Sequence, residues 1–296
     1  MTDSRLRGVG TALVTPFRHD GRLDEAALRA LVDWQVAEGI QFLVPCGSTG
    51  EAATLAPDEH RRVVEIVVEQ VAGRVPVCAG AGGNDTRKAI ALSREMEAIG
   101  ATHLLHVSPA YSKPPQRGIE AHFRAIADAV SIPIVLYNVP GRTASNIEPQ
   151  TTLSLASVPN IAAVKEASGD IGQITRIINE RPQGFAVLSG DDELTLEVMR
   201  AGGDGVISVI SNAVPRLFTE LVTAAGSGNF DRAAEAQERL LPIMRAAFVE
   251  SNPIPIKAAM SMLGRCENIL RLPLVPMEQG HDATLRSALT AAGALK

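Results

Sequence analysis

Residues 132–137 read IPIVLY and residues 185–189 read FAVLS, two short runs in which apolar side chains follow one another instead of alternating with polar ones. A strand with one face in water shows that alternation, whereas a strand covered on both faces does not. Strands covered on both faces are typical of a parallel sheet with helices packed against it. These runs therefore indicate an α/β protein.

Further runs of this kind occur along most of the chain, separated by segments with helical periodicity. In residues 24–38, for example, Leu28, Leu31 and Val32 fall on one helical face. We expect eight strands, at residues 10–14, 42–45, 75–79, 103–107, 134–137, 161–165, 185–189 and 205–209. The helices expected between the first six strands are at residues 24–38, 57–71, 86–99, 119–130 and from 149 onward. Eight such units in about 220 residues fit a closed (β/α)8 TIM barrel.

An open, doubly wound sheet is the alternative architecture, but the first strand is not followed by its glycine-rich dinucleotide fingerprint. From about Asn229 onward the pattern is helical only, with helices expected at residues 230–249, 254–263 and 281–292. We therefore expect a catalytic barrel over residues 1–228 and a C-terminal helical extension over residues 229–296.

The composition narrows the function classes. The 296 residues are 46% hydrophobic, enough for a large core, and their formal net charge of −5 argues against nucleic acid or anionic membranes as partners. No run of about 18 apolar residues predicts a membrane-spanning helix. Residues 1–5 lack the apolar stretch of a signal peptide, and the three cysteines lack the spacing of a disulfide framework. A cytoplasmic location is expected.

The active site of such a barrel lies at the C-terminal ends of its strands. Lys165, in the apolar run IAAVKEAS, is the most informative residue there. An apolar environment lowers the pKa of a lysine and frees its amine to attack a ketone. The alternative is a lysine that reaches solvent or pairs with Glu166 or Asp191.

Both tyrosines of the chain, Tyr111 and Tyr137, follow expected strands and could exchange protons beside the lysine. Either alone could equally be a packing residue. The sequence GSTGE at residues 47–51 offers two glycines that allow unusual backbone angles, together with N–H and hydroxyl donors for a carboxylate. It could also be a helix-capping turn. Arg142 could bind a second carboxylate through paired hydrogen bonds, or be a solvated surface residue.

We expect neither a metal nor an organic cofactor. His103 and His106 lie three residues apart on an expected strand, point to opposite faces and cannot share a metal ion. The glycine-rich residues 80–84 match neither a dinucleotide nor a P-loop pattern. Asp191 and Asp192 follow the seventh strand, where barrels commonly bind phosphate, and would repel it.

Seven motifs in order give the chain a close resemblance to the dihydrodipicolinate synthase/N-acetylneuraminate lyase family. They are GVGTALVTPF (8–17), GSTGEAATL (47–55), YNVPGRT (137–143), VKEASGD (164–170), LSGDDELTL (188–196), GGDGVISV (202–209) and NPIPIK (252–257). The resemblance covers essentially the whole chain. It implies a lyase with class I aldolase chemistry on pyruvate, usually a homotetramer built from two tight dimers.

Residue by residue, the resemblance makes Lys165 the Schiff-base lysine and Tyr137 its proton donor and acceptor. Ser48 and Tyr111 correspond to the other members of a proton relay, and the family's equivalent of Tyr111 crosses the tight-dimer interface into the neighbouring site. Thr49 and Ile207 correspond to positions that contact pyruvate.

Within the family, YNVPGRT and NPIPIK resemble the synthase branch, in which Arg142 corresponds to the arginine that binds the carboxylate of L-aspartate 4-semialdehyde. The implied product is 4-hydroxy-tetrahydrodipicolinate. Its formation is the first committed step of diaminopimelate and lysine biosynthesis. The alternative is a sister aldolase or dehydratase acting on a sugar acid or 2-keto acid, of the N-acetylneuraminate lyase or 2-keto-3-deoxygluconate aldolase type. Ser48 favours that alternative, because the synthase relay commonly has threonine there, whose extra methyl restricts the rotamer. A barrel that binds pyruvate without catalysis is a further alternative, which the lysine and tyrosines disfavour.

Inhibition by lysine is expected to be weak or absent. In lysine-sensitive relatives the inhibitor site carries acidic and aromatic groups at the positions of Lys88 and Ala110. A cationic ammonium and a methyl group cannot replace a carboxylate and an aromatic ring in binding an amino acid with a positive side chain. A dose–response curve of activity against L-lysine checks this, and strong inhibition below millimolar lysine would contradict it.

Overall fold

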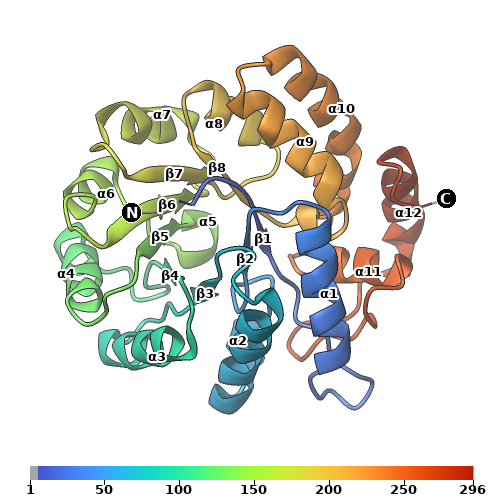
Figure 1. The fold of residues 1–296 in the computed structure, drawn as a ribbon, viewed down its shortest axis with the longest axis horizontal. Coiled ribbons are helices and arrows are strands. Elements are labelled where there is room, and N and C mark those ends of the chain that lie inside the picture. Colours follow the sequence, from blue (N-terminus) through green and yellow to red (C-terminus); the bar gives the residue numbers. More distant parts are fainter. Residues whose placement is uncertain (1–5, 296) are drawn as a thin grey trace.

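The computed structural model describes residues 6–295, so residues 1–5, where the sequence predicts no signal peptide, lie outside the described part. Its eight strands form one parallel sheet in the order β2-β1-β8-β7-β6-β5-β4-β3 (Figure 1). The strands are β1 Gly8–Ala12, β2 Phe42–Val44, β3 Cys78–Gly80, β4 His103–Val107, β5 Ile134–Asn138, β6 Ile161–Glu166, β7 Ala186–Ser189 and β8 Gly205–Ser208. The parallel sheet confirms the α/β class.

The two ends of this strand order meet and nearly close the barrel. Leu43 of β2 donates its N–H to the carbonyl of Pro76 at 3.0 Å, and Gly80 of β3 donates to Pro45 at 2.9 Å. On the other side β1 and β8 approach so closely that a Cβ on Gly205 would lie 2.0 Å from the carbonyl oxygen of Gly8. Only glycine fits at Gly205. The predicted TIM barrel is confirmed.

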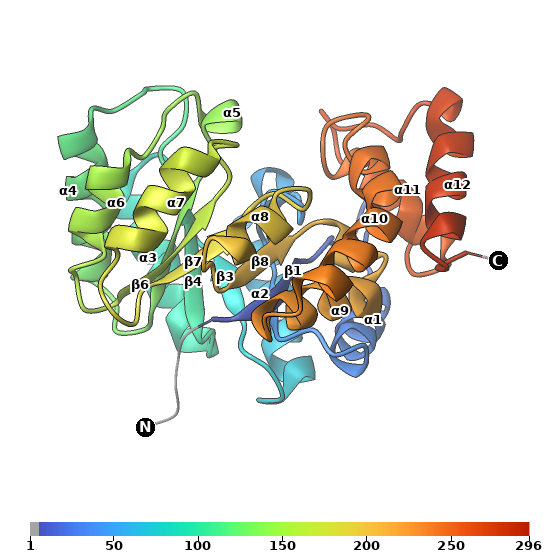
Figure 2. The same cartoon turned by 90° about the horizontal axis from the view of Figure 1, so that it is seen from above.

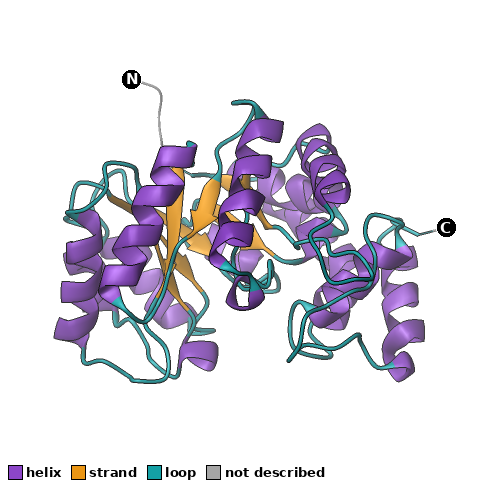
Figure 3. Ribbon diagram, turned by 90° about the horizontal axis from the view of Figure 1, so that it is seen from below, coloured by secondary structure: helices purple, strands orange, loops and turns teal. Residues whose placement is uncertain are grey.

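Helices surround the strands, as Figure 3 shows, and several begin at an aspartate whose side chain accepts main-chain N–H bonds, such as Asp24, Asp85 and Asp170. The helices of the barrel are α1 Glu25–Ala37, α2 Pro57–Val71, α3 Thr86–Ile99, α4 Gln116–Ala127, α5 Pro140–Thr143, α6 Pro149–Leu155, α7 Ile171–Glu180, α8 Thr195–Arg200 and α9 Pro215–Gly226. Short 3-10 turns occur at Ala52–Thr54, Ile210–Asn212 and Gln279–His281.

Three further helices follow: α10 Phe230–Ala246, α11 Ile254–Met262 and α12 Asp282–Ala291. Helix α10 packs against α9 and α12, and α11 packs against α12. Figures 1 and 2 place α11 and α12 at the opposite end of the molecule from α4. No helix within residues 6–295 is long and apolar enough to cross a membrane.

Two expected strands begin two or three residues away from the expected position. The third was expected at 75–79 but is Cys78–Gly80, because Pro76 has no N–H and the N–H of Val77 is bonded to Thr102 Oγ1. The first was expected at 10–14 but is Gly8–Ala12, since the N–H of Val14 is bonded to Asn212 Oδ1 instead of a neighbouring strand.

Apolar side chains fill the barrel interior beneath the C-terminal strand ends. They form a cluster separate from the larger core between strands and helices, and include Phe42, Val44, Leu105, Val135, Tyr137, Ala163, Leu188 and Ile207. Side chains alternate between these two cores along each strand. A polar side chain on the inward face at a C-terminal strand end therefore has only the open end of the barrel to point toward.

His106, on the outward face of β4, is fully buried, and its Nε2 lies 3.2 Å from Ser93 Oγ. Burial lowers the pKa of His106 from its ordinary value of 6.5 to about 3. Between these two values the unfolded chain binds more protons than the folded protein, so stability falls as the pH falls through this window.

Lowering the pH from 7 to 5 should therefore reduce the free energy of unfolding by about 2 kcal/mol through His106. The variant His106→Asn loses this contribution, whereas the control His19→Asn, at a side chain that is 83% exposed, keeps it. Urea unfolding at both pH values measures the difference. Equal pH dependence in His106→Asn and the parent protein would contradict the assignment.

Candidate active site

A pocket of about 710 Å³ opens at the C-terminal ends of the strands. Each strand, or the residue directly after it, contributes to its lining: Ala12, Val44, Gly80, Val107, Tyr137, Lys165, Gly190 and Val209. Residues of the C-terminal helical part form a further wall, among them Phe248, Asn252 and Leu274. The pocket thus lies where the sequence predicts the active site.

Lys165 and Tyr137 are direct neighbours on β6 and β5. Both are buried, with exposures of 5% and 8%, and the Nζ of Lys165 lies 4.3 Å from the centroid of the Tyr137 ring. A buried primary amine beside a phenol, both lining one pocket, is an arrangement suited to imine chemistry with proton transfer.

The alternatives that the sequence left open for Lys165 are not realised. The lysine is only 5% exposed, and among residues 6–295 no ion pair joins it to Glu166 or Asp191. Glu166 points to the opposite face of β6. There it accepts hydrogen bonds from Asn138 Nδ2 at 3.1 Å, the Ser168 N–H at 2.8 Å and Gln173 Nε2 at 3.1 Å.

Burial raises the pKa of Glu166, and these hydrogen bonds oppose the rise. Because Asn138 directly follows Tyr137 and Glu166 directly follows Lys165, their hydrogen bond joins the two strands beside the reactive pair. This Asn138–Glu166 pair was not expected from the sequence. Asn138 and Glu166 do lie within the YNVPGRT and VKEASGD motifs, which is the signal that could have found them.

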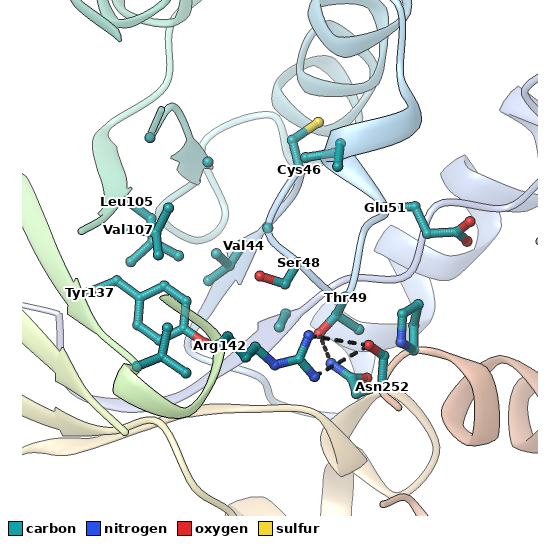
Figure 4. Close-up of a pocket in the computed structure, with 18 of the residues that line it drawn as sticks. Val44, Cys46, Ser48, Thr49, Glu51, Leu105, Val107, Tyr137, Arg142 and Asn252 are labelled. Carbon is teal, nitrogen blue, oxygen red and sulfur yellow. Dashed lines mark hydrogen bonds between the residues drawn. The ribbon is translucent and has the colours of Figure 1, made fainter. Parts of the chain in front are cut away.

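The turn at residues 47–51 brings Ser48 and Thr49 to the pocket (Figure 4). Ser48 is exposed and Thr49 is buried. The two glycines allow unusual backbone angles, but the left-handed residues at this turn are Cys46 and Glu51, with φ of +56° and +53°. Gly50 is closely packed, because a Cβ there would lie 3.0 Å from the Leu13 carbonyl oxygen.

Asn252, which the sequence analysis did not single out, connects two of the expected binding residues. Its Nδ2 donates to Thr49 Oγ1 at 2.9 Å, and its main-chain carbonyl accepts from Arg142 Nη1 and Nη2 at 3.4 and 3.3 Å. Figure 4 shows these bonds, with the Tyr137 ring and Ser48 on the same pocket. The predicted Thr49 and Arg142 therefore lie side by side, joined through the NPIPIK motif.

Two expected site residues are placed elsewhere. Tyr111 does not line the pocket of its own chain; it is 92% exposed, has a φ of +65°, and donates its N–H to the carbonyl of Thr143. Ile207 is fully buried in the barrel interior and its side chain lies outside the pocket lining.

The acidic residues after β7 have separate surroundings. Asp191 lines the pocket, whereas Asp192 is buried and accepts main-chain N–H bonds from Val209 and Ile210 at 3.1 and 2.9 Å. Burial raises the pKa of Asp192 to about 6. Within residues 6–295 no three His, Cys, Asp or Glu side chains are grouped as metal ligands.

Comparison with known proteins gives one consistent result. The model of the "Dihydrodipicolinate synthetase family" matches residues 5–292. A 4-hydroxy-tetrahydrodipicolinate synthase of Koribacter versatilis is 51% identical over 293 residues, 99% of this chain and 98% of the relative. The Thermotoga maritima dihydrodipicolinate synthase structure has a TM-score of 0.96 at 43% identity, covering 98% and 99% of the two chains. A chloride-inhibited dihydrodipicolinate synthase from Acinetobacter baumannii, complexed with pyruvate, has a TM-score of 0.96 at 39% identity, with the same coverage.

The absence of a side chain at Gly190 leaves room for Lys165. A Cβ on Gly190 would lie 3.1 Å from Lys165 Cε and 2.7 Å from Ala167 Cβ. Gly190→Ala should therefore displace the lysine and slow its reaction with a small 2-keto acid at least tenfold. Gly83→Ala, where the new Cβ meets nothing within 4 Å, is the matched control. Borohydride trapping followed by mass spectrometry gives both rates; equal rates in the two variants would refute this reading.

Proposed function

The chain belongs to the dihydrodipicolinate synthetase family, and on that basis we propose that Lys165 forms an imine with pyruvate, which then condenses with L-aspartate 4-semialdehyde. The chain is an enzyme, a lyase with the 4-hydroxy-tetrahydrodipicolinate synthase activity for which its relatives are named. That activity serves lysine and diaminopimelate biosynthesis. The observation that carries the proposed mechanism is the buried Lys165 beside Tyr137 in a pocket that also receives Arg142.

The reaction begins when the neutral amine of Lys165 adds to the keto carbon of pyruvate. Tyr137 protonates the resulting hydroxyl, which leaves as water, so that amine plus ketone gives imine plus water. Loss of a proton from the former methyl group then yields the enamine. The pyruvate complex of the Acinetobacter baumannii relative supports pyruvate as the first substrate.

The carboxylate of pyruvate binds at the turn of residues 47–51. Thr49 Oγ1 accepts the amide hydrogen of Asn252, so its own hydroxyl hydrogen is directed elsewhere and can be donated to a carboxylate oxygen. Ile207, beneath the pocket, contributes through its backbone. The catalytic groups belong to the barrel of residues 1–228, and the extension of residues 229–296 supplies the wall with Asn252.

The second substrate binds through Arg142. Its guanidinium is oriented by the carbonyl of Asn252 and keeps further N–H donors for the carboxylate of L-aspartate 4-semialdehyde. The enamine carbon attacks the aldehyde, and the amine of the semialdehyde then displaces Lys165 by transimination, which closes the ring. A sugar-acid tail has no second carboxylate to bind, so Arg142 favours this substrate over those of sister aldolases.

Ser48 and Tyr111 pass protons between Tyr137 and solvent. Tyr111 is almost fully exposed and lies outside the pocket of its own chain, which supports its delivery into the site of a neighbouring subunit. The assembly would then be a homotetramer of two tight dimers. We place the enzyme in the cytoplasm; its cysteines Cys46, Cys78 and Cys266 are all free, which is usual in a reducing compartment.

Lys165→Ala should abolish covalent capture of pyruvate, because it removes the only nucleophile of the proposed imine. Intact mass after incubation with pyruvate and borohydride measures the capture. Lys88→Ala, at an exposed lysine, should capture pyruvate like the parent protein. An undiminished adduct in Lys165→Ala would contradict the assignment of Lys165 as the Schiff-base lysine.

Arg142→Ala should raise the KM for L-aspartate 4-semialdehyde about 30- to 150-fold, since a charge-assisted pair contributes about 2–3 kcal/mol. Pyruvate capture should stay within twofold, because Arg142 is assigned to the second substrate only. Steady-state kinetics in an assay coupled to dihydrodipicolinate reductase supplies the KM values. A change confined to pyruvate would argue instead that Arg142 binds the first substrate.

A further inference from the structure

Lys257, in α11, has no exposed surface, although lysine is among the side chains least often fully buried. Its Nζ lies 2.5 Å from Oε1 of Glu51, a residue 206 positions away along the chain, and 4.2 Å from the centroid of the Phe17 ring. The other carboxylate oxygen of Glu51 accepts the main-chain N–H of Arg271 at 3.0 Å. Both oxygens of Glu51 are therefore satisfied by the C-terminal part of the chain.

Glu51 is the last residue of the GSTGE turn and adopts a φ of +53°, a left-handed conformation that a residue with a Cβ rarely takes. Such a conformation persists only where surrounding contacts fix it. Two residues earlier in the turn, Thr49 accepts the amide hydrogen of Asn252. Both ends of the NPIPIK segment, residues 252–257, thus contact the turn: Asn252 binds Thr49 and Lys257 binds Glu51.

The ion pair is poorly explained as a source of stability alone. Desolvation of two buried charges cancels much of their attraction, so a buried pair contributes little net free energy compared with apolar residues of the same size. Burial lowers the pKa of Lys257, and the adjacent Glu51 opposes that change. The pair does hold Glu51 in one defined position. Because Glu51 ends the turn that carries Ser48 and Thr49, the turn is held as well.

We propose that Lys257 is a positioning residue for the first substrate: through its ion pair with Glu51 it fixes the 47–51 turn in the conformation that presents Ser48 and Thr49 to the carboxylate of pyruvate. Lys257 does not touch the substrate. This inference rests on the proposed function of the turn. It assigns to α11 a part in pyruvate binding and none in binding the second substrate.

Three variants test it in the full-length enzyme. Lys257→Met removes the charge and keeps most of the stem, Lys257→Met/Glu51→Gln removes both charges, and Glu51→Gln preserves size and shape. We expect the pyruvate KM to rise at least tenfold in the first two and severalfold in the third, with the semialdehyde KM within twofold of the parent. The double variant should regain melting temperature relative to Lys257→Met, because no unpaired charge remains, without regaining the pyruvate KM.

Arg181→Met is the matched control, because it breaks the ion pair of Arg181 with Asp204 at the opposite end of the barrel. It should lower the melting temperature and leave both KM values unchanged. If Lys257→Met does not fold, the double variant and Glu51→Gln carry the test.

The two proposals fail in different ways. If the parent enzyme captures no pyruvate after borohydride reduction, the proposed function is wrong. If the parent captures pyruvate but the folded Lys257 and Glu51 variants retain its pyruvate KM, the positioning role is overturned and the proposed function stands. If the double variant recovers both the melting temperature and the pyruvate KM, the ion pair has a purely structural role and the positioning role is likewise overturned.

Discussion

The parallel register of β5 on β6 is the constraint on which the rest of the site depends. It pairs Tyr137 with Lys165 on the inward face and Asn138 with Glu166 on the outward face. Because side chains alternate along a strand, a slip of one residue would turn the reactive amine into the outer core and the carboxylate into the pocket. The hydrogen bonds that Glu166 accepts from Asn138 and Gln173 resist such a slip, so the outward pair maintains the geometry of the inward one.

The barrel alone does not complete the pocket. Asn252 and Lys257 lie on the C-terminal side of the barrel sequence, yet they contact Thr49, Glu51 and the Arg142 guanidinium. The two binding regions proposed for the two carboxylates are consequently linked through one short segment. Such a link explains why an extension that carries none of the proposed reactive groups packs beside the mouth of the barrel, with Phe248 and Leu274 on the pocket wall.

The sequence predicted much of this organisation because the signals are local. Continuous apolar runs identified all eight strands, and the rule for strand ends selected Lys165 and Tyr137 as neighbours in one site. The expected bounds of β3 failed because Pro76 has no N–H and Thr102, from a later segment, binds the N–H of Val77. Crowding of Gly50 by the Leu13 carbonyl is likewise a contact between distant residues. The Lys257–Glu51 pair joins residues 206 positions apart, and no local pattern reports it. Tyr111 lies outside the pocket of its own chain, so its proposed part in the relay depends on a neighbouring subunit.

In the proposed mechanism, a pyruvate imine on Lys165 condenses within one pocket with an aldehyde whose carboxylate binds Arg142. The most direct measurement is NADPH consumption coupled to dihydrodipicolinate reductase, with pyruvate and L-aspartate 4-semialdehyde supplied together and each omitted in turn. Turnover is expected only when both substrates are present. No turnover with both substrates, in enzyme whose Lys165 still captures pyruvate, would contradict the proposed mechanism and would point to a different aldehyde partner.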